Sequence, residues 1–113
     1  RINAEDPADD FRPDPGTITH FEPPSGDGVR VDTHVESGYR IPPFYDSMIA
    51  KLVVHGATRS DAIERGRRAL AAFRIDGVAT TIPLHLRLLD EAAFRDGRYD
   101  TLWLERLLAD GKD

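Results

Sequence analysis

The periodicity of the apolar residues changes near Gly56, and this change limits the folds open to the chain. Residues 29–35 alternate strictly between apolar or β-branched and polar side chains, which predicts a half-buried antiparallel strand. Residues 47–55 are largely apolar on both faces, which predicts a central strand. From residue 62 to residue 73 the apolar side chains instead recur at helical spacing. Strands followed by helices predict an α+β domain, in which an antiparallel β-sheet from the N-terminal half has about three helices from the C-terminal half packed on it.

The rest of the N-terminal half divides into short strands and loops. Residues 17–21 are β-branched and aromatic and lie between turn-forming residues, which predicts a strand. Residues 1–4 are interpreted as the last residues of a strand that begins in a longer chain. Residues 6–15 are polar and contain several prolines, so we expect a loop there, and a second loop is expected over residues 38–46.

Three threonines mark the expected helix starts. Thr58 is followed three residues later by Asp61, the spacing of a capping box, and Asp76-Gly77 supplies the stop for this first helix. Thr81 precedes a second amphipathic segment. Thr101 precedes a third and is expected to be its N-cap.

Composition excludes several classes of function. A single domain of 113 residues carries a formal net charge of -5, which argues against a nucleic-acid binder. The chain has no cysteine, which suits a cytoplasmic location and leaves no thiolate ligand or nucleophile. No apolar run approaches the roughly 20 residues of a membrane span. The four histidines lack zinc-like spacing, so no metal site is expected.

Six blocks of sequence occur in order along essentially the whole chain. They are residues 1–7 (RINAEDP), 13–16 (PDPG), 28–32 (GVRVD), 42–52 (PPFYDSMIAKL), 74–81 (RIDGVATT) and 99–105 (YDTLWLE). Together they resemble the C-terminal domain of the biotin carboxylases found in acetyl-CoA, propionyl-CoA and other acyl-CoA carboxylases. The resemblance implies that residues 1–113 are one domain of a larger ATP-grasp enzyme and that this domain closes the active site.

Enzymes of this family make carboxyphosphate from ATP and bicarbonate and then carboxylate biotin held on a carrier. The resemblance therefore implies biotin, ATP and Mg as cofactors of the parent enzyme, with none bound by this chain alone. Implied partners are the upstream ATP-grasp domain, a biotin carboxyl carrier protein or domain, a carboxyltransferase subunit and a second copy in a homodimer. The ATP, metal and bicarbonate residues lie upstream in this family, so the isolated chain is expected to be inactive.

By resemblance, Arg1 is the catalytic and biotin-binding residue, because it matches an arginine that contacts the ureido oxygen of biotin. Removing the ureido N–H proton places negative charge on that oxygen. A fixed guanidinium that donates to the oxygen would stabilise the enolate-like charge. Arginine suits this role better than lysine because its planar fork stays charged and aims several donors at one region.

Three other residues receive smaller roles from the resemblance. Arg30 matches a residue at or near the family's dimer interface, although Asp27 stands nearby where other members often have an apolar residue; the alternative is a solvent-facing strand residue. Asp46 is a second candidate interface residue that would pair with a basic group of the missing domains, or else a turn-forming aspartate bonded to its own backbone. Thr101 matches a segment at the adenine edge of the nucleotide pocket.

A non-catalytic interaction module with the same fold is the alternative hypothesis. In that case Arg30, the aromatic loop around Phe44 and the strand edges would contact a partner. The size of the native polypeptide separates the two hypotheses, because an enzyme domain must belong to a chain several-fold longer.

Overall fold

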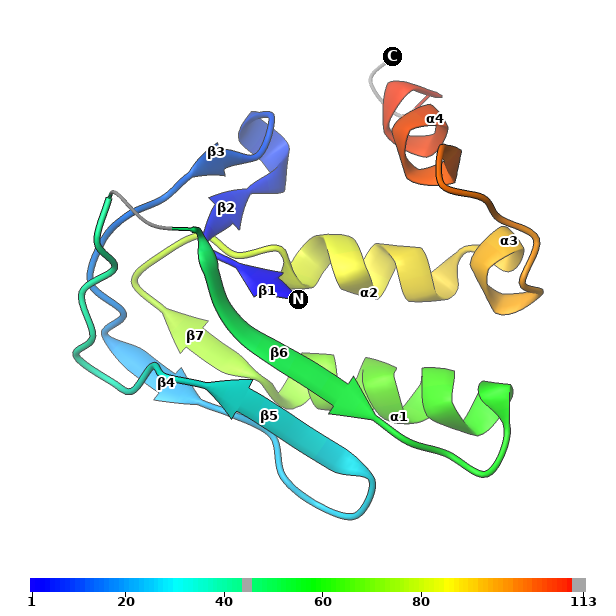
Figure 1. Cartoon of the computed structure of the whole chain (residues 1–113), viewed down its shortest axis with the longest axis horizontal. Helices are drawn as coiled ribbons and strands as arrows, with labels where there is room; N and C mark the ends of the chain where they lie inside the picture. The colour runs from blue at the N-terminus through cyan, green and yellow to red at the C-terminus, as the bar shows by residue number, and fades with distance from the viewer. Residues whose placement is uncertain (44–45, 111–113) are drawn as a thin grey trace.

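The computed structural model describes residues 1–43 and 46–110, and its main sheet has three antiparallel strands. Their order is β1 (Ile2–Asn3), β6 (Met48–Val54) and β5 (Val29–Thr33). The predicted central strand is confirmed, since β6 pairs with β1 on one side and with β5 on the other. Figure 1 shows β6 crossing the middle of the molecule.

The register of β5 and β6 gives the sheet one covered and one open face. Val31 is paired with Leu52, and both side chains pack against the core. The neighbouring pairs project to the opposite face, because side chains alternate along a strand. These more exposed residues are Arg30, Asp32, Lys51 and Val53. Exposure therefore alternates as predicted from Val29 to Asp32, whereas Thr33, which was expected on the same face as the valines, is exposed at the end of the strand.

Two smaller strand pairs were only partly predicted. The strand expected over residues 17–21 is β4 (His20–Glu22), and its partner is β7 (Arg74–Asp76). The loop expected over residues 6–15 contains β2 (Glu5–Asp6), a 3-10 turn (Pro7–Asp9) and β3 (Arg12–Pro13). Both pairs are antiparallel, so all strand pairing in the described residues is antiparallel, as expected for this fold class.

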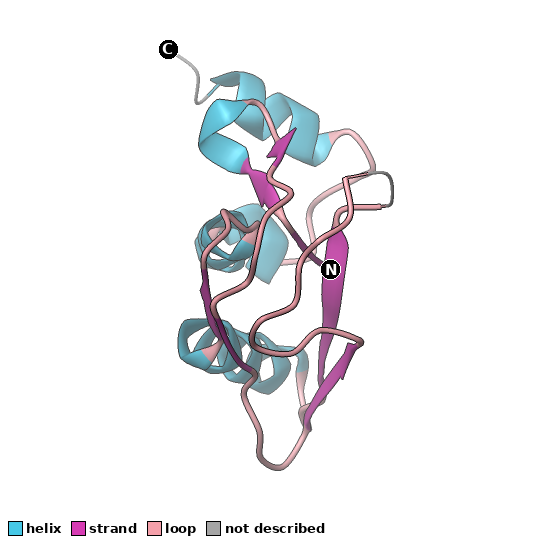
Figure 2. Ribbon diagram, turned by 90° about the vertical axis from the view of Figure 1, so that its left-hand side faces the viewer, coloured by secondary structure: helices cyan, strands magenta, loops and turns pink. Residues whose placement is uncertain are grey.

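The C-terminal half contains four helices in the described residues, one more than predicted. They are α1 (Arg59–Ala72), α2 (Ile82–Asp90), α3 (Ala92–Arg95) and α4 (Trp103–Asp110). Figures 1 and 2 show α1 and α2 running alongside each other on one side of the β5–β6 layer. The predicted α+β arrangement, with helices on one side of the sheet, is confirmed.

The three threonines expected at helix starts have different outcomes. Thr58 caps α1 as expected, since its hydroxyl accepts a hydrogen bond from the Asp61 N–H. The hydroxyl of Thr81 does not cap α2, although the helix begins directly after it. The assignment of Thr101 as the cap of α4 is wrong, because the carboxylate of Asp100 accepts the Leu102 N–H at 3.0 Å.

The first helix also ends earlier than predicted. It stops at Ala72, and Asp76-Gly77 ends β7 instead. Gly77 has φ +105°, and a Cβ atom there would lie 2.3 Å from the Thr17 carbonyl oxygen. Only glycine fits so close to the backbone that leads into β4.

The core joins β1 to the sheet and to the first two helices. Ile2 and Ile18 are almost fully buried, and Phe73 packs edge-on against Phe21 with ring centroids 5.5 Å apart. Burying one isoleucine stabilises the fold by about 1.5–3 kcal/mol. Because Ile2 is anchored in this core, the backbone of the adjacent residue Arg1 is held at the edge of the core.

Candidate functional site

The short strand β1 is held on both of its edges. On one edge it pairs with β6, and the Ala4 N–H donates to the Ser47 carbonyl at 2.8 Å. On the other edge the Asn3 N–H donates to the Thr81 hydroxyl at 3.0 Å, and the Thr81 N–H donates to the Asn3 carbonyl at 3.1 Å. The start of the chain is therefore positioned by two other parts of the sequence, β6 with its preceding residue and the residue before α2.

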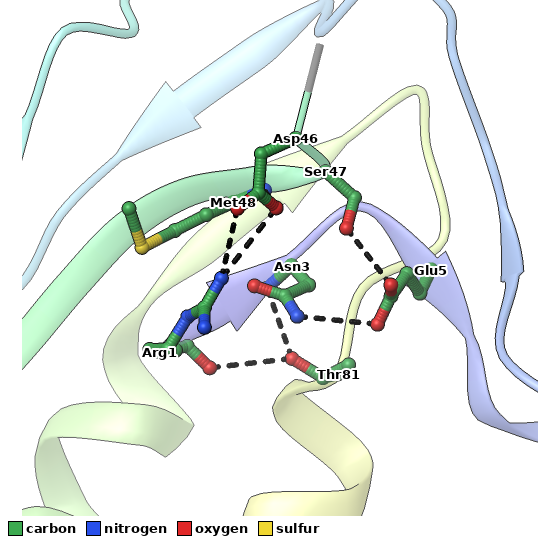
Figure 3. Close-up of polar contacts among 7 residues, drawn as sticks. All are labelled: Arg1, Asn3, Glu5, Asp46, Ser47, Met48 and Thr81. Atoms are coloured by element: carbon green, nitrogen blue, oxygen red, sulfur yellow. Dashed lines mark hydrogen bonds and ion pairs between the residues drawn. The ribbon is translucent and has the colours of Figure 1, made fainter.

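The side chain of Arg1 is directed by Asp46. Its Nη2 lies 3.2 Å from Asp46 Oδ2, and the side chains are 56% and 66% exposed (Figure 3). The other carboxylate oxygen, Oδ1, accepts the Met48 N–H at 3.1 Å, which fixes the aspartate itself. Of the two roles considered for Asp46, the hydrogen bond to nearby backbone is therefore observed, and the interface role stays a prediction. The ion pair engages one edge of the guanidinium and leaves Nε and Nη1 in no hydrogen bond with the described residues.

A second polar network supports this pair. Ser47 Oγ donates to Glu5 Oε2 at 2.8 Å, and Asn3 Nδ2 donates to Glu5 Oε1 at 3.2 Å (Figure 3). Glu5 therefore ties the strand that follows Arg1 to the residue that follows Asp46. Sequence reasoning missed Glu5 and Ser47 as site residues, although both lie inside the blocks that carry the family resemblance.

His85 contacts the backbone of Arg1 from α2. Its Nε2 lies 2.6 Å from the Arg1 carbonyl oxygen and 3.5 Å from the Thr81 hydroxyl. Burial lowers the pKa of His85 below its ordinary value of 6.5, while the bond to the Arg1 carbonyl works in the opposite direction. Nothing in the local sequence pattern had singled out this histidine.

The other predicted site residues lie away from Arg1. Arg30 is exposed on β5, with its Nε 3.3 Å from Asp32 Oδ1. Thr101 is exposed in the turn before α4, two residues from both Tyr99 and Trp103, whose rings are 5.8 Å apart. The aromatic residue Phe44 lies outside the described residues. The structure therefore brings Asp46 to Arg1, and the roles given to Arg30 and Thr101 stay predictions.

Two general features bound the chemistry of residues 1–43 and 46–110. No group of three or more histidine, cysteine, aspartate or glutamate side chains gathers there in a way that could hold a metal ion. No helix in the same residues has the length and apolar character to cross a membrane.

Comparison with known proteins gives consistent matches across nearly the whole chain. Residues 1–106 match the family model described as biotin carboxylase C-terminal domain. Biotin carboxylase 1 of Bacillus subtilis is 53% identical over 105 residues, which cover 93% of this chain and 23% of that protein. The biotin carboxylase of Haemophilus influenzae is 50% identical over 108 residues, which cover 96% of this chain and 24% of that protein.

Solved structures agree with the sequence matches. The biotin carboxylase domain dimer of Hydrogenobacter thermophilus 2-oxoglutarate carboxylase, determined with MgADP, ADP and bicarbonate, superimposes with a TM-score of 0.91. It is 46% identical, and the match covers 94% of this chain and 23% of that one. This chain therefore spans less than a quarter of the length of these relatives.

Proposed function

Because this chain belongs to the family of biotin carboxylase C-terminal domains, we propose that it closes one wall of the active site in a biotin carboxylase. In this proposal Arg1 donates to the ureido oxygen of biotin and stabilises the enolate formed when the ureido nitrogen loses its proton. The domain would be inactive alone, because it corresponds to less than a quarter of its relatives.

The observation that carries the proposal is the way Arg1 is held. Its backbone is fixed between β6 and α2, and Asp46 engages its guanidinium at 3.2 Å. The side chain nevertheless remains 56% exposed and keeps two unbonded nitrogens, Nε and Nη1, among the described residues. An arginine that is both oriented and accessible is suited to bind a developing oxyanion without rearrangement.

Biotin, ATP and Mg are the cofactors we propose for the parent enzyme. Of these three cofactors, the described residues are suited only to biotin. Arg1 offers hydrogen-bond donors, and no acidic cluster among these residues suits a metal ion. The nucleotide and its metal would be bound by an upstream ATP-grasp domain, with Thr101 at the adenine edge of the pocket. The solved relative from Hydrogenobacter thermophilus was bound to MgADP, ADP and bicarbonate, which supports a nucleotide, Mg and bicarbonate as ligands of the parent enzyme.

The proposed partners follow the same reasoning. We propose a cytoplasmic enzyme in which a carrier protein or domain presents biotin and a carboxyltransferase takes over the carboxyl group. The solved relative is a dimer of biotin carboxylase domains, which supports a homodimer here. Arg30 stands on the open face of the β5–β6 sheet and could reach a second copy, whereas Asp46 is already engaged by Arg1.

Replacing Arg1 in the intact enzyme tests the proposed function. Arg1→Ala should lower the rate of biotin carboxylation by about 100- to 1000-fold, the usual cost of losing one preorganised donor to an oxyanion. The KM for ATP should change little, because ATP binds elsewhere. Arg1→Lys keeps the charge but loses the planar fork, so it should recover only part of the rate.

Two comparisons complete this experiment. Arg98→Ala, which removes an exposed arginine paired with Asp96 far along the chain, should retain wild-type activity. An Arg1→Ala enzyme that carboxylates biotin within a few-fold of wild type would remove Arg1 from the reaction. An immunoblot of source cells should also detect a polypeptide several-fold longer than 113 residues.

A further inference from the structure

The strand that follows Arg1 is too short to hold its own position. It has two residues and pairs with β6 along one edge only. Its second edge is completed by the N-terminal turn of α2 rather than by another strand. Thr81 bonds both backbone groups of Asn3, and His85 bonds the carbonyl of Arg1.

The contact of His85 with Arg1 has a defined direction. A carbonyl oxygen can only accept a hydrogen bond, so Nε2 of His85 must carry the proton that it donates. The separation of 2.6 Å places this among the shortest polar contacts around β1. The ring is half-buried on α2, and burial favours its neutral form. His85 therefore acts as a fixed donor toward the backbone of Arg1.

The consequence for Arg1 comes from covalent geometry. The carbonyl that His85 binds is attached to the Cα atom from which the Arg1 side chain departs. Holding this peptide unit therefore fixes the position of the Cα atom, while Asp46 holds the far end of the same side chain. Neither contact uses Nε or Nη1 of the guanidinium, so those donors remain available.

We propose that His85 is a positioning residue for Arg1 in the carboxylation of biotin. This inference rests on the proposed function and deepens it. It explains how Arg1, which precedes a strand of only two residues, is held in position. The essential feature is the Nε2–H donor, so any side chain that places a similar donor at this point should serve.

Variants of His85 in the intact enzyme test this role. His85→Leu removes the donor and puts an apolar side chain of similar size in its place. In His85→Gln, the side-chain amide nitrogen can instead donate to the Arg1 carbonyl. We expect His85→Leu to lower kcat/KM for free biotin by about 10- to 100-fold, the effect typical of a misplaced catalytic group. The glutamine variant should retain most of the activity, and the KM for ATP should stay within about two-fold in both.

Matched controls separate positioning from general stability. His55→Leu replaces an exposed histidine whose ring forms no hydrogen bond within the described residues, and it should leave kcat/KM unchanged. If His85→Leu fails to accumulate, His85→Asn replaces it, since a shorter amide cannot reach the carbonyl and should show the same loss. Combining His85→Leu with Arg1→Ala should cause no further loss, because His85 acts through Arg1.

The possible results distinguish this inference from the proposed function. If Arg1→Ala is inactive but the leucine and asparagine variants of His85 match wild type, the positioning role is wrong and the proposed function stands. Failure of glutamine to rescue, or an equal loss for biotin and ATP, would also overturn it. If Arg1→Ala itself is active, the proposed function fails first.

Discussion

Replacing Asp46 by asparagine separates two roles of this side chain. One carboxylate oxygen accepts the Met48 N–H at 3.1 Å, and the other pairs with Arg1 at 3.2 Å. Asparagine keeps a side-chain oxygen for the Met48 N–H and removes only the negative charge. The turn should therefore survive while Arg1 loses its anionic partner.

The expected size of the effect follows from solvent exposure. Arg1 and Asp46 are 56% and 66% exposed, and exposed ion pairs contribute about 0.2–1 kcal/mol. Since about 1.36 kcal/mol corresponds to a tenfold change, this energy amounts to about 1.4- to 5-fold in rate. Asp46→Asn should lower kcat/KM for biotin by this amount and leave thermal stability nearly unchanged.

The assay is steady-state carboxylation of free biotin by the intact enzyme at low and at high salt. Screening weakens exposed pairs, so wild type and Asp46→Asn should converge as salt rises. Asp96→Asn is the control, because Asp96 forms a similar exposed pair with Arg98 at 2.9 Å. A loss of about 100-fold or more would refute the reasoning, since a charge that merely orients Arg1 cannot contribute so much. Identical rates at low salt would also refute it.

Two further predictions concern stability and can be measured as thermal inactivation of the intact enzyme. Gly77→Ala should destabilise by at least about 1–3 kcal/mol, because φ is +105° and the new Cβ would lie 2.3 Å from the Thr17 carbonyl oxygen. Gly38→Ala has a similar φ of +91° but open space, so an equal loss in both variants would contradict the role of the close contact. Because burial lowers the pKa of His85, its neutral form stabilises the fold fully above pH 6.5, and this contribution is lost as pH falls further. His85→Gln should flatten that loss below pH 6.5, and an unchanged pH profile would show that another group titrates.

The sequence was sufficient for elements whose signals are local. The apolar run around β6 and the Thr58–Asp61 spacing each depend on neighbouring residues, and both predictions were confirmed. The three residues of β7 were taken as the end of a helix because their strand character depends on pairing with β4, which lies more than fifty residues earlier. Such pairing leaves no periodic signal within three residues.

The contacts of the candidate site follow the same rule: those between near neighbours in sequence could be predicted, and those between distant residues could not. The turn formed by Asp46 could be predicted, because its partner Met48 is two residues away. Its pairing with Arg1 spans 45 residues and could not. Thr81 shows the same competition, since its hydroxyl bonds the Asn3 N–H in β1 instead of capping its own helix. The role given to Arg1 came from family resemblance and stays a prediction that the geometry supports.

The bond between Arg1 and His85 also has a consequence for biosynthesis. The two residues are separated by 84 positions, so β1 cannot acquire its second edge until the ribosome has released α2. At about 5–20 residues per second, this interval lasts about 4–17 s. Under the proposed function, an upstream domain that folds first would lack a positioned Arg1 during that time. Completion of the domain would then set the moment at which the newly made enzyme becomes competent.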